Sequence, residues 1–278
     1  QALDSRGRCE ERAAFHTSVP RLAVAAMKPP NGGRAAATVL DICFLVHGMG
    51  GTYRDWDTWV EILSARLPEW RIVPLRSLST ATRFMGAGVD ACARLAAAEI
   101  VAALQAEGDG PNAPTLRAHF VGHSMGGIIV RGALAQVELE LGDRFPELGH
   151  YVSLSTPHLG SQAPWSTPQY WWRNLCWITS PITPQLAQLA AQDGSKGRRP
   201  YLAELAHCDG VHWQLLRRFK TRTCATLASG DPLIPAASGA VEPGVPIREP
   251  HGLGATSWSI EHRSTSPADA AGGFEAAV

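Results

Sequence analysis

The sequence lacks the features that most directly assign a protein to a class. It has no apolar run of about 18 residues, so no transmembrane helix is expected. Its 25 basic and 25 acidic residues give a formal net charge of +0, which removes the electrostatic case for nucleic acid as a partner. No cluster of His, Cys and carboxylate residues has metal-ligand spacing, so neither a metal nor a cofactor is predicted.

Paired cysteine motifs are absent as well. None of the six cysteines belongs to a C-x-x-C pair, and several fall within apolar runs. Buried free thiols in a reducing compartment explain this distribution better than a disulfide framework does. We therefore expect a protein that is cytoplasmic or peripheral to an intracellular membrane. The cysteines are Cys9, Cys43, Cys92, Cys176, Cys208 and Cys224.

The sequence does contain strand-like and helix-like segments in alternation. This order predicts an α/β fold with a doubly wound, mostly parallel sheet. The domain is expected over residues 38–252, between a poorly ordered arm (1–37) and a disordered tail (253–278). Strands are predicted at Val39–Val46, Arg71–Leu75, Ala118–Val121, Tyr151–Ser155 and Arg222–Leu227, and helices at Asp55–Leu67 (capped by Asp55), Gly88–Gln105, Gly127–Leu134 and Val211–Phe219.

The strongest chemical signal is the pentapeptide GHSMG, from Gly122 to Gly126. It fits the G-x-S-x-G pattern, which has a meaning only where a strand, a sharp turn and a helix follow one another. An apolar run precedes it and a helix-compatible run follows it. Ser124 is therefore the predicted nucleophile, exposed in a strained turn where glycines leave room for neighbouring backbone. The alternative is a glycine-rich turn with an incidental serine.

The acid of a catalytic triad should follow Ser124, because the chain order in this fold class is Ser, then Asp or Glu, then His. Asp231 meets this requirement, since it follows the strand predicted to end at Leu227. Asp193 and Asp209 are weaker candidates because neither follows a strand. Asp is also a common turn residue, so a purely structural Asp231 is the competing interpretation.

The base should follow Asp231, where only His251 and His262 remain. His251 lies between Pro250 and Gly252, as in a tight loop, and is preferred. His262 belongs to the polar tail. Neither segment has a clear helix or strand pattern, so the true base could be absent from this chain.

Donors for the oxyanion are expected from two backbone amides. One is Met125, after the nucleophile, and the other is Met49, in the loop His47-Gly48-Met49-Gly50-Gly51 that follows the first predicted strand. His47 is a candidate for substrate contact, although it could instead structure this loop. The triad order excludes His123 and His158 as bases, so packing or supporting roles are expected for them.

The alternation of strands and helices breaks between residues 161 and 200, where tryptophans and prolines are frequent. We expect a lid-like insertion that offers apolar surface to an acyl chain, or to a membrane or lipid droplet. A satellite hydrophobic cluster under a long loop is an equally good interpretation. The candidate substrate-contacting residues here are Trp165, Trp171 and Trp172.

Four segments occur together in one known family. HGMGG, VGHSMGGIIVR, STPHLG and DPLIP-x-x-S, in this order, resemble the serine esterases of the α/β-hydrolase class, a family first catalogued as a domain of unknown function, with plant and fungal lipases among its members. The resemblance covers Val39 to Ser238. It implies an α/β-hydrolase fold and hydrolysis of acyl-lipid esters, with Ser124 as nucleophile and Asp231 as acid.

These signals predict a serine ester hydrolase, lipase-like, that acts on an acyl lipid or a small ester. A protein deacylase or thioesterase would use the same triad. A non-catalytic, lipid-binding homologue would keep the fold and the apolar pocket without a complete triad.

Overall fold

The computed structural model describes residues 39–82, 86–108, 113–161, 169–179, 181–227, 231, 233–235, 238–239, 241 and 258–259. All of them belong to one compact unit that begins at Ala37. The predicted N-terminal arm lies outside these residues. The predicted tail does too, apart from its two-residue strand.

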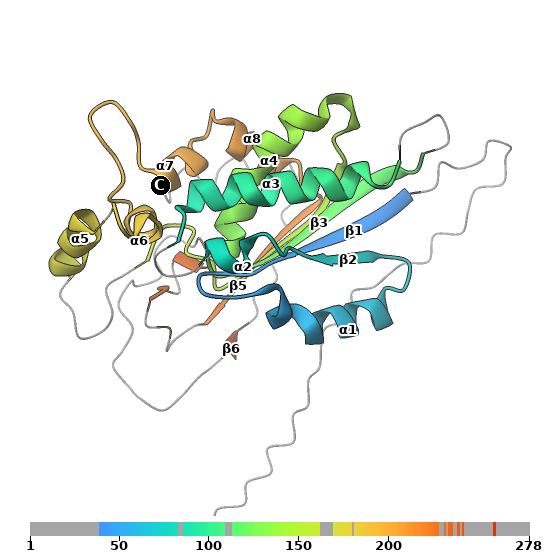
Figure 1. The fold of residues 1–278 in the computed structure, drawn as a ribbon, viewed down its shortest axis with the longest axis horizontal. Helices are drawn as coiled ribbons and strands as arrows, with labels where there is room; N and C mark the ends of the chain where they lie inside the picture. The colour runs from blue at the N-terminus through green and yellow to red at the C-terminus, as the bar shows by residue number, and fades with distance from the viewer. Residues whose placement is uncertain are drawn as a thin grey trace, which may run out of the picture. The chain divides into compact units, whose positions relative to one another are not determined.

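A six-stranded sheet forms the centre of this unit (Figure 1). Its strands are β1 (Val39–Val46), β2 (Arg71–Pro74), β3 (Thr115–His123), β4 (Glu147–Leu154), β5 (Thr221–Leu227) and β6 (Trp258–Ser259). The order across the sheet is β2-β1-β3-β4-β5-β6. The first five strands pair in parallel, and β6 runs antiparallel to β5. The predicted mostly parallel sheet is therefore confirmed.

Helices cover both faces of the sheet. They are α1 (Asp57–Arg66), α2 (Leu78–Ala81), α3 (Val89–Gln105), α4 (Met125–Leu141), α5 (Gln169–Ile178), α6 (Pro184–Leu189), α7 (Tyr201–Ala206) and α8 (Val211–Arg217), with 3₁₀ turns η1 (Tyr53–Trp56) and η2 (Gly142–Arg144). Helices α3, α4 and α8 share one face, and α1 lies on the other (Figure 1). The α/β class predicted from the alternation is thus confirmed.

The sequence of β1 explains why the sheet is covered on both faces. Successive side chains of a strand point to opposite faces. Ile42, Phe44 and Val46 enter the large core with α3, α4 and α8, whereas Cys43 and Leu45 enter the smaller core beside α1. Both sets are almost fully buried. A near-continuous apolar run is what a strand between two helical layers requires.

The predicted helix at Asp55–Leu67 differs from the observed one at its start. Residues 53–56 form η1 before α1 begins, and the N-cap is Thr52 for η1 and Trp56 for α1, not Asp55. The Thr52 amide and hydroxyl donate to the Asp55 carboxylate at 2.9 and 3.2 Å. Asp55 therefore closes a capping box from the first turn.

Two helices, α5 and α6, lie within residues 161–200, where the sequence indicated only a break in the pattern. Pro184 opens α6 at its first helical position. A proline is tolerated there because the amide it lacks would have no helical acceptor. The proline that suggested an interruption therefore marks a helix start.

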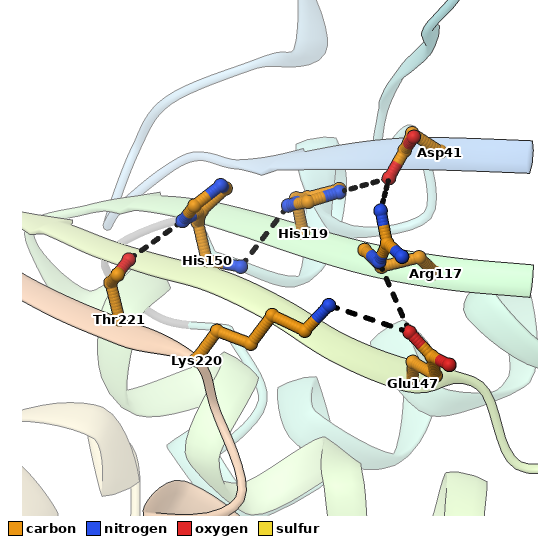
Figure 2. A network of polar contacts seen from close by, with 7 residues as sticks. All are labelled: Asp41, Arg117, His119, Glu147, His150, Lys220 and Thr221. Carbon is orange, nitrogen blue, oxygen red and sulfur yellow. Dashed lines mark hydrogen bonds and ion pairs between the residues drawn. The ribbon is translucent and has the colours of Figure 1, made fainter. Parts of the chain in front are cut away.

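The amino-terminal halves of neighbouring strands carry a polar network (Figure 2). His119 Nε2 lies 2.8 Å from Asp41 Oδ1, and the His150 amide donates to His119 Nδ1 at 3.1 Å. Because Nδ1 accepts, the proton of this ring is on Nε2 and donates to Asp41. The His119 ring stacks on Trp70, at a centroid distance of 4.0 Å, and on His150, at 4.9 Å.

Ion pairs extend this network along the same end of the strands. Arg117 bridges Asp41 at 3.3 Å and Glu147 at 3.2 Å, and Lys220 lies 3.5 Å from Glu147 (Figure 2). Since parallel strands share one direction, this network lies at the edge of the sheet opposite to Ser124, which follows the carboxyl end of β3. It stabilises the sheet and takes no part in the candidate site.

Candidate active site

Ser124 is the single residue between β3 and α4. Its backbone has φ 53° and ψ −128°, a conformation that residues other than glycine rarely adopt. Holding a residue there costs about 1–3 kcal/mol, and such strain concentrates at functional sites. The serine is partly exposed, although the residues around it are mostly buried.

Two glycines make this tight turn possible. A Cβ on Gly126 would lie 2.1 Å from the Val46 carbonyl oxygen, and a Cβ on Gly122 would lie 2.5 Å from the backbone of Gly127. Neither contact leaves room for a methyl group. The first turn of α4 therefore packs directly against the end of β1, which brings the loop after β1 to the serine.

That loop, from His47 to Gly51, touches the nucleophile candidate. A Cβ on Gly48 would lie 2.6 Å from Ser124 Cβ and 3.1 Å from Ser124 Oγ. Within the part of the chain that the structure describes, the amides of Met49 and Met125 have no hydrogen-bond acceptor. The two amides predicted as oxyanion donors are thus unengaged, one in the loop beside Ser124 and one at the start of α4.

His47 is 2 % exposed, so its side chain is part of the loop rather than of its surface. Its Nδ1 lies 3.0 Å from the Gly48 carbonyl oxygen. A carbonyl can only accept, so Nδ1 carries the proton. Nε2 is buried and has no partner among the described residues.

The residue that follows β4 has a positive φ, as Ser124 has after β3. Ser155 follows β4 and has φ 44°, again a positive value for a residue other than glycine. The Ser124 amide donates to the Leu154 carbonyl at 2.8 Å, and the Ser155 amide donates to the Ala225 carbonyl at 2.7 Å. These backbone hydrogen bonds link Ser124 to the end of β4, and link Ser155, which follows β4, to β5.

Asp231, the predicted acid, follows β5. Its Oδ1 accepts the amides of Leu233 and Ile234, both at 2.9 Å. Its second oxygen has no partner among the residues described. One carboxylate oxygen is thus fixed by the loop, and the other is available to a further donor.

Electrostatics relate Asp231 to the turn at Ser124. Burial lowers the pKa of His123, and the carboxylates of Asp231 and Asp55 both act to raise it. These charges act on the residue that precedes Ser124. Asp55 also lies against the glycine-rich loop, since a Cβ on Gly51 would lie 2.9 Å from Asp55 Oδ2. The sequence prediction gave Asp55 no place at the site. The Thr52-x-x-Asp55 capping pattern next to the glycine-rich loop was the signal that could have revealed it.

A buried polar chain supports α4 from behind. Arg131, 1 % exposed, donates from Nη1 to His158 Nδ1 at 3.2 Å and from Nη2 to the Leu205 carbonyl at 2.9 Å. His158 Nε2 then donates to Ser153 Oγ at 2.9 Å. Burial lowers the pKa of Arg131, and burial together with Arg131 holds the pKa of His158 well below its ordinary value. His158 therefore has the packing role expected for it.

His251, His262 and Trp165 lie outside the described residues. Trp172 belongs to α5, but its side chain is not described. Trp171 is 57 % exposed on the same helix, and Leu175 and Ile178, one and two turns further on, are exposed as well.

Three further features concern the described part of the chain only. No group of His, Cys, Asp or Glu residues in it could hold a metal ion. None of its helices is long and apolar enough to cross a membrane. Its five cysteines are free, and Cys43, Cys92 and Cys176 are buried.

Comparisons with solved structures give distant similarities. A lipase of Bacillus licheniformis shares 15 % identity over 67 % of this chain and 66 % of its own, with a TM-score of 0.39. A phospholipase of Legionella pneumophila shares 24 % identity over 44 % of this chain and 26 % of its own, with a TM-score of 0.30. A thioesterase of Streptomyces coelicolor shares 20 % identity over 64 % and 65 %, with a TM-score of 0.28.

The chain covers less than two thirds of the length of each of these proteins. None of the curated proteins matches the chain.

The chain matches a described protein family. The model described as "Putative serine esterase (DUF676)" matches residues 38–242, which include β1 to β5, the turn at Ser124, the loop at His47 and Asp231. The match covers most of the chain. The protein therefore belongs to this serine esterase family of α/β-hydrolases.

Proposed function

We propose that the protein is a serine ester hydrolase, lipase-like, which cleaves acyl esters with Ser124 as nucleophile. The observation that carries this proposal is the conformation of Ser124. A residue at φ 53° and ψ −128° between strand and helix presents its side chain at the carboxyl edge of the sheet. The strain of about 1–3 kcal/mol is retained in folded proteins where exposure of the side chain is used.

The oxyanion formed by attack on the ester carbonyl would be held by the Met49 and Met125 amides. Both are without an acceptor among the described residues, as donors reserved for a substrate must be. The Met125 amide also begins α4, whose positive end favours developing negative charge. Removing one such donor typically lowers kcat by about 10²–10³-fold.

Asp231 would orient the base. Its second oxygen, which has no partner among the described residues, can accept the Nδ1–H of a histidine, while the Leu233 and Ile234 amides hold the first. The histidine would then take the proton of Ser124 through Nε2 and return it to the leaving alcohol. We assign this role to His251, with His262 as the alternative.

The acyl part of the substrate is proposed to contact the exposed apolar side of α5. Trp171, Leu175 and Ile178 recur at i, i+4 and i+7 and are 57, 51 and 66 % exposed. A helix side with this spacing is apolar along its length. It would suit a lipid substrate or its surface better than a small polar ester.

Replacement of Ser124 by alanine tests the proposal. Hydrolysis of a short-chain p-nitrophenyl ester and labelling by a fluorophosphonate should both be lost in Ser124→Ala. Ser195→Ala, which removes a hydroxyl from an exposed turn, should keep both. Undiminished turnover in Ser124→Ala, or a wild-type protein that is neither active nor labelled, would refute the proposal.

Two further measurements refine it. His251→Ala should lower kcat by several orders of magnitude and His262→Ala should not, because members of a triad act as a unit. The reverse result would transfer the role of base to His262. Comparing turnover of acylglycerol, phospholipid and acyl-thioester substrates separates a lipase from a thioesterase or protein deacylase.

A further inference from the structure

The loop before the nucleophile contains a buried histidine that the proposed reaction does not use. We infer that His47 is a positioning residue: it fixes the Gly48–Met49 peptide so that the Met49 amide stays directed at the oxyanion. This inference rests on the proposed function, since it concerns how that function's oxyanion donor is held. It gives His47 a role through Met49 rather than in contact with substrate.

The Gly48 carbonyl oxygen is held by two donors. His47 Nδ1 donates to it at 3.0 Å, and the Gly51 amide donates to it at 3.2 Å. The ring is 2 % exposed, so water does not compete for this hydrogen bond. A Cβ on Gly51 would lie 3.1 Å from His47 Nδ1, so a glycine at this position leaves room for the ring.

Holding this oxygen also fixes an amide. The carbonyl of Gly48 and the N–H of Met49 belong to one planar peptide unit, in which they point in opposite directions. An oxygen anchored inside the loop therefore turns the Met49 N–H away from the loop interior. That N–H has no acceptor among the described residues, and it follows the residue that packs against Ser124.

The need for such an anchor follows from Gly48 itself. Only glycine fits at this position, because a Cβ would lie 2.6 Å from Ser124 Cβ. Glycine, however, leaves its backbone torsions free, so the Gly48–Met49 peptide could rotate and turn the amide away from Ser124. His47 restores the rigidity that the close approach removes. Electrostatic stabilisation of a transition state depends on donors that are oriented in advance.

A matched pair of variants tests this role. Asparagine at position 47 keeps an N–H donor at the same number of bonds from Cα as Nδ1, and leucine has a similar size without a donor. In His47→Leu we expect kcat for a short-chain ester to fall by about 10-fold or more, with KM changed less than about 2-fold. A trifluoromethyl ketone, which forms a tetrahedral adduct with the serine, should lose affinity by the same factor as kcat. His47→Asn should recover most of both.

The outcomes separate this inference from the proposed function. An active His47→Leu with wild-type kcat and adduct affinity would overturn it and leave the hydrolase intact. The same holds if His47→Asn is as impaired as His47→Leu while both melt at the wild-type temperature. If His47→Leu does not fold, His47→Gln replaces it, because its amide lies one bond further out and should fail where asparagine succeeds. Absence of hydrolysis and labelling in the wild type would instead remove the proposed function, and this inference with it.

Discussion

Acidification should weaken the fold through His119, far from the candidate active site. Burial lowers the pKa of this residue to about 4, from 6.5 for an ordinary histidine, against the opposing effect of its hydrogen bond to Asp41. This value also includes the charges of His150 and Arg117, which lower the pKa, and the charge of Asp41, which raises it. The unfolded chain therefore binds a proton here as the pH falls through 6.5, and the folded chain does so only near 4. Stability that is present above pH 6.5 is lost between these two values.

The expected loss is large for a domain of this kind. One pKa unit corresponds to about 1.4 kcal/mol, so the difference between 6.5 and about 4 amounts to roughly 3 kcal/mol of unfolding free energy. The side chain is 3 % exposed, so solvent screening does not reduce this value. The free energy of unfolding of a domain is typically about 5–15 kcal/mol, so this loss would be a substantial part of it. Most of the loss should be complete by pH 4.5.

Urea unfolding at pH 7, 6, 5 and 4.5 measures this loss, with His119→Gln as the reference. Glutamine keeps an N–H near Asp41 but cannot titrate. The variant should be less stable at pH 7, because it loses the stacking on Trp70, and its stability should fall less with acid by about 3 kcal/mol. Parallel curves for the two proteins would refute the reasoning. A wild type that resists acid better than the variant would show that Asp41 outweighs burial.

Three other predictions concern the site. Ser124→Gly should be more stable than Ser124→Ala by about 1 kcal/mol, and should melt at a higher temperature, because glycine alone accepts φ 53° without strain. Equal melting temperatures would contradict this. Gly48→Ala should abolish fluorophosphonate labelling, because the new Cβ would lie 2.6 Å from Ser124 Cβ. The control Gly50→Ala has open space around its Cβ and should stay labelled, although its φ of 70° should lower the free energy of unfolding by about 1 kcal/mol. Arg131→Lys should cost about 2 kcal/mol in urea unfolding, because one ammonium cannot replace two separate guanidinium donors; an unchanged value would contradict this.

Local composition predicted a strand well where nearly all of its residues are apolar. β1 runs from Val39 to Val46 as predicted, because every position but one in that run is apolar. β3 begins three residues earlier than predicted and includes Thr115 and Arg117. Arg117 is paired across the sheet with Asp41 and Glu147, and cross-strand pairs of this kind leave no hydrophobic pattern in the sequence.

The candidate site was predictable only as far as its motifs are continuous in the chain. The strand, turn and helix around Ser124 could be read from one pentapeptide and its flanks. Away from the site, the polar network at His119 could not be predicted, since its members are single residues on separate strands that the strand register brings together. Asp55 was misassigned as a helix cap, because a carboxylate in the first turn and one at the N-cap differ by only three positions.

The backbone hydrogen bonds beyond the strand ends have a consequence for how sequence change acts on the site. Ser124 is tied to Leu154, and Ser155 to Ala225, through main-chain atoms alone. The spacing between Ser124 and the strand that leads to Asp231 is thus set by peptide groups, which every substitution except proline preserves. Side chains on β4 can therefore diverge widely without altering that spacing, whereas the insertion of one residue into β4 would shift it by a whole register step.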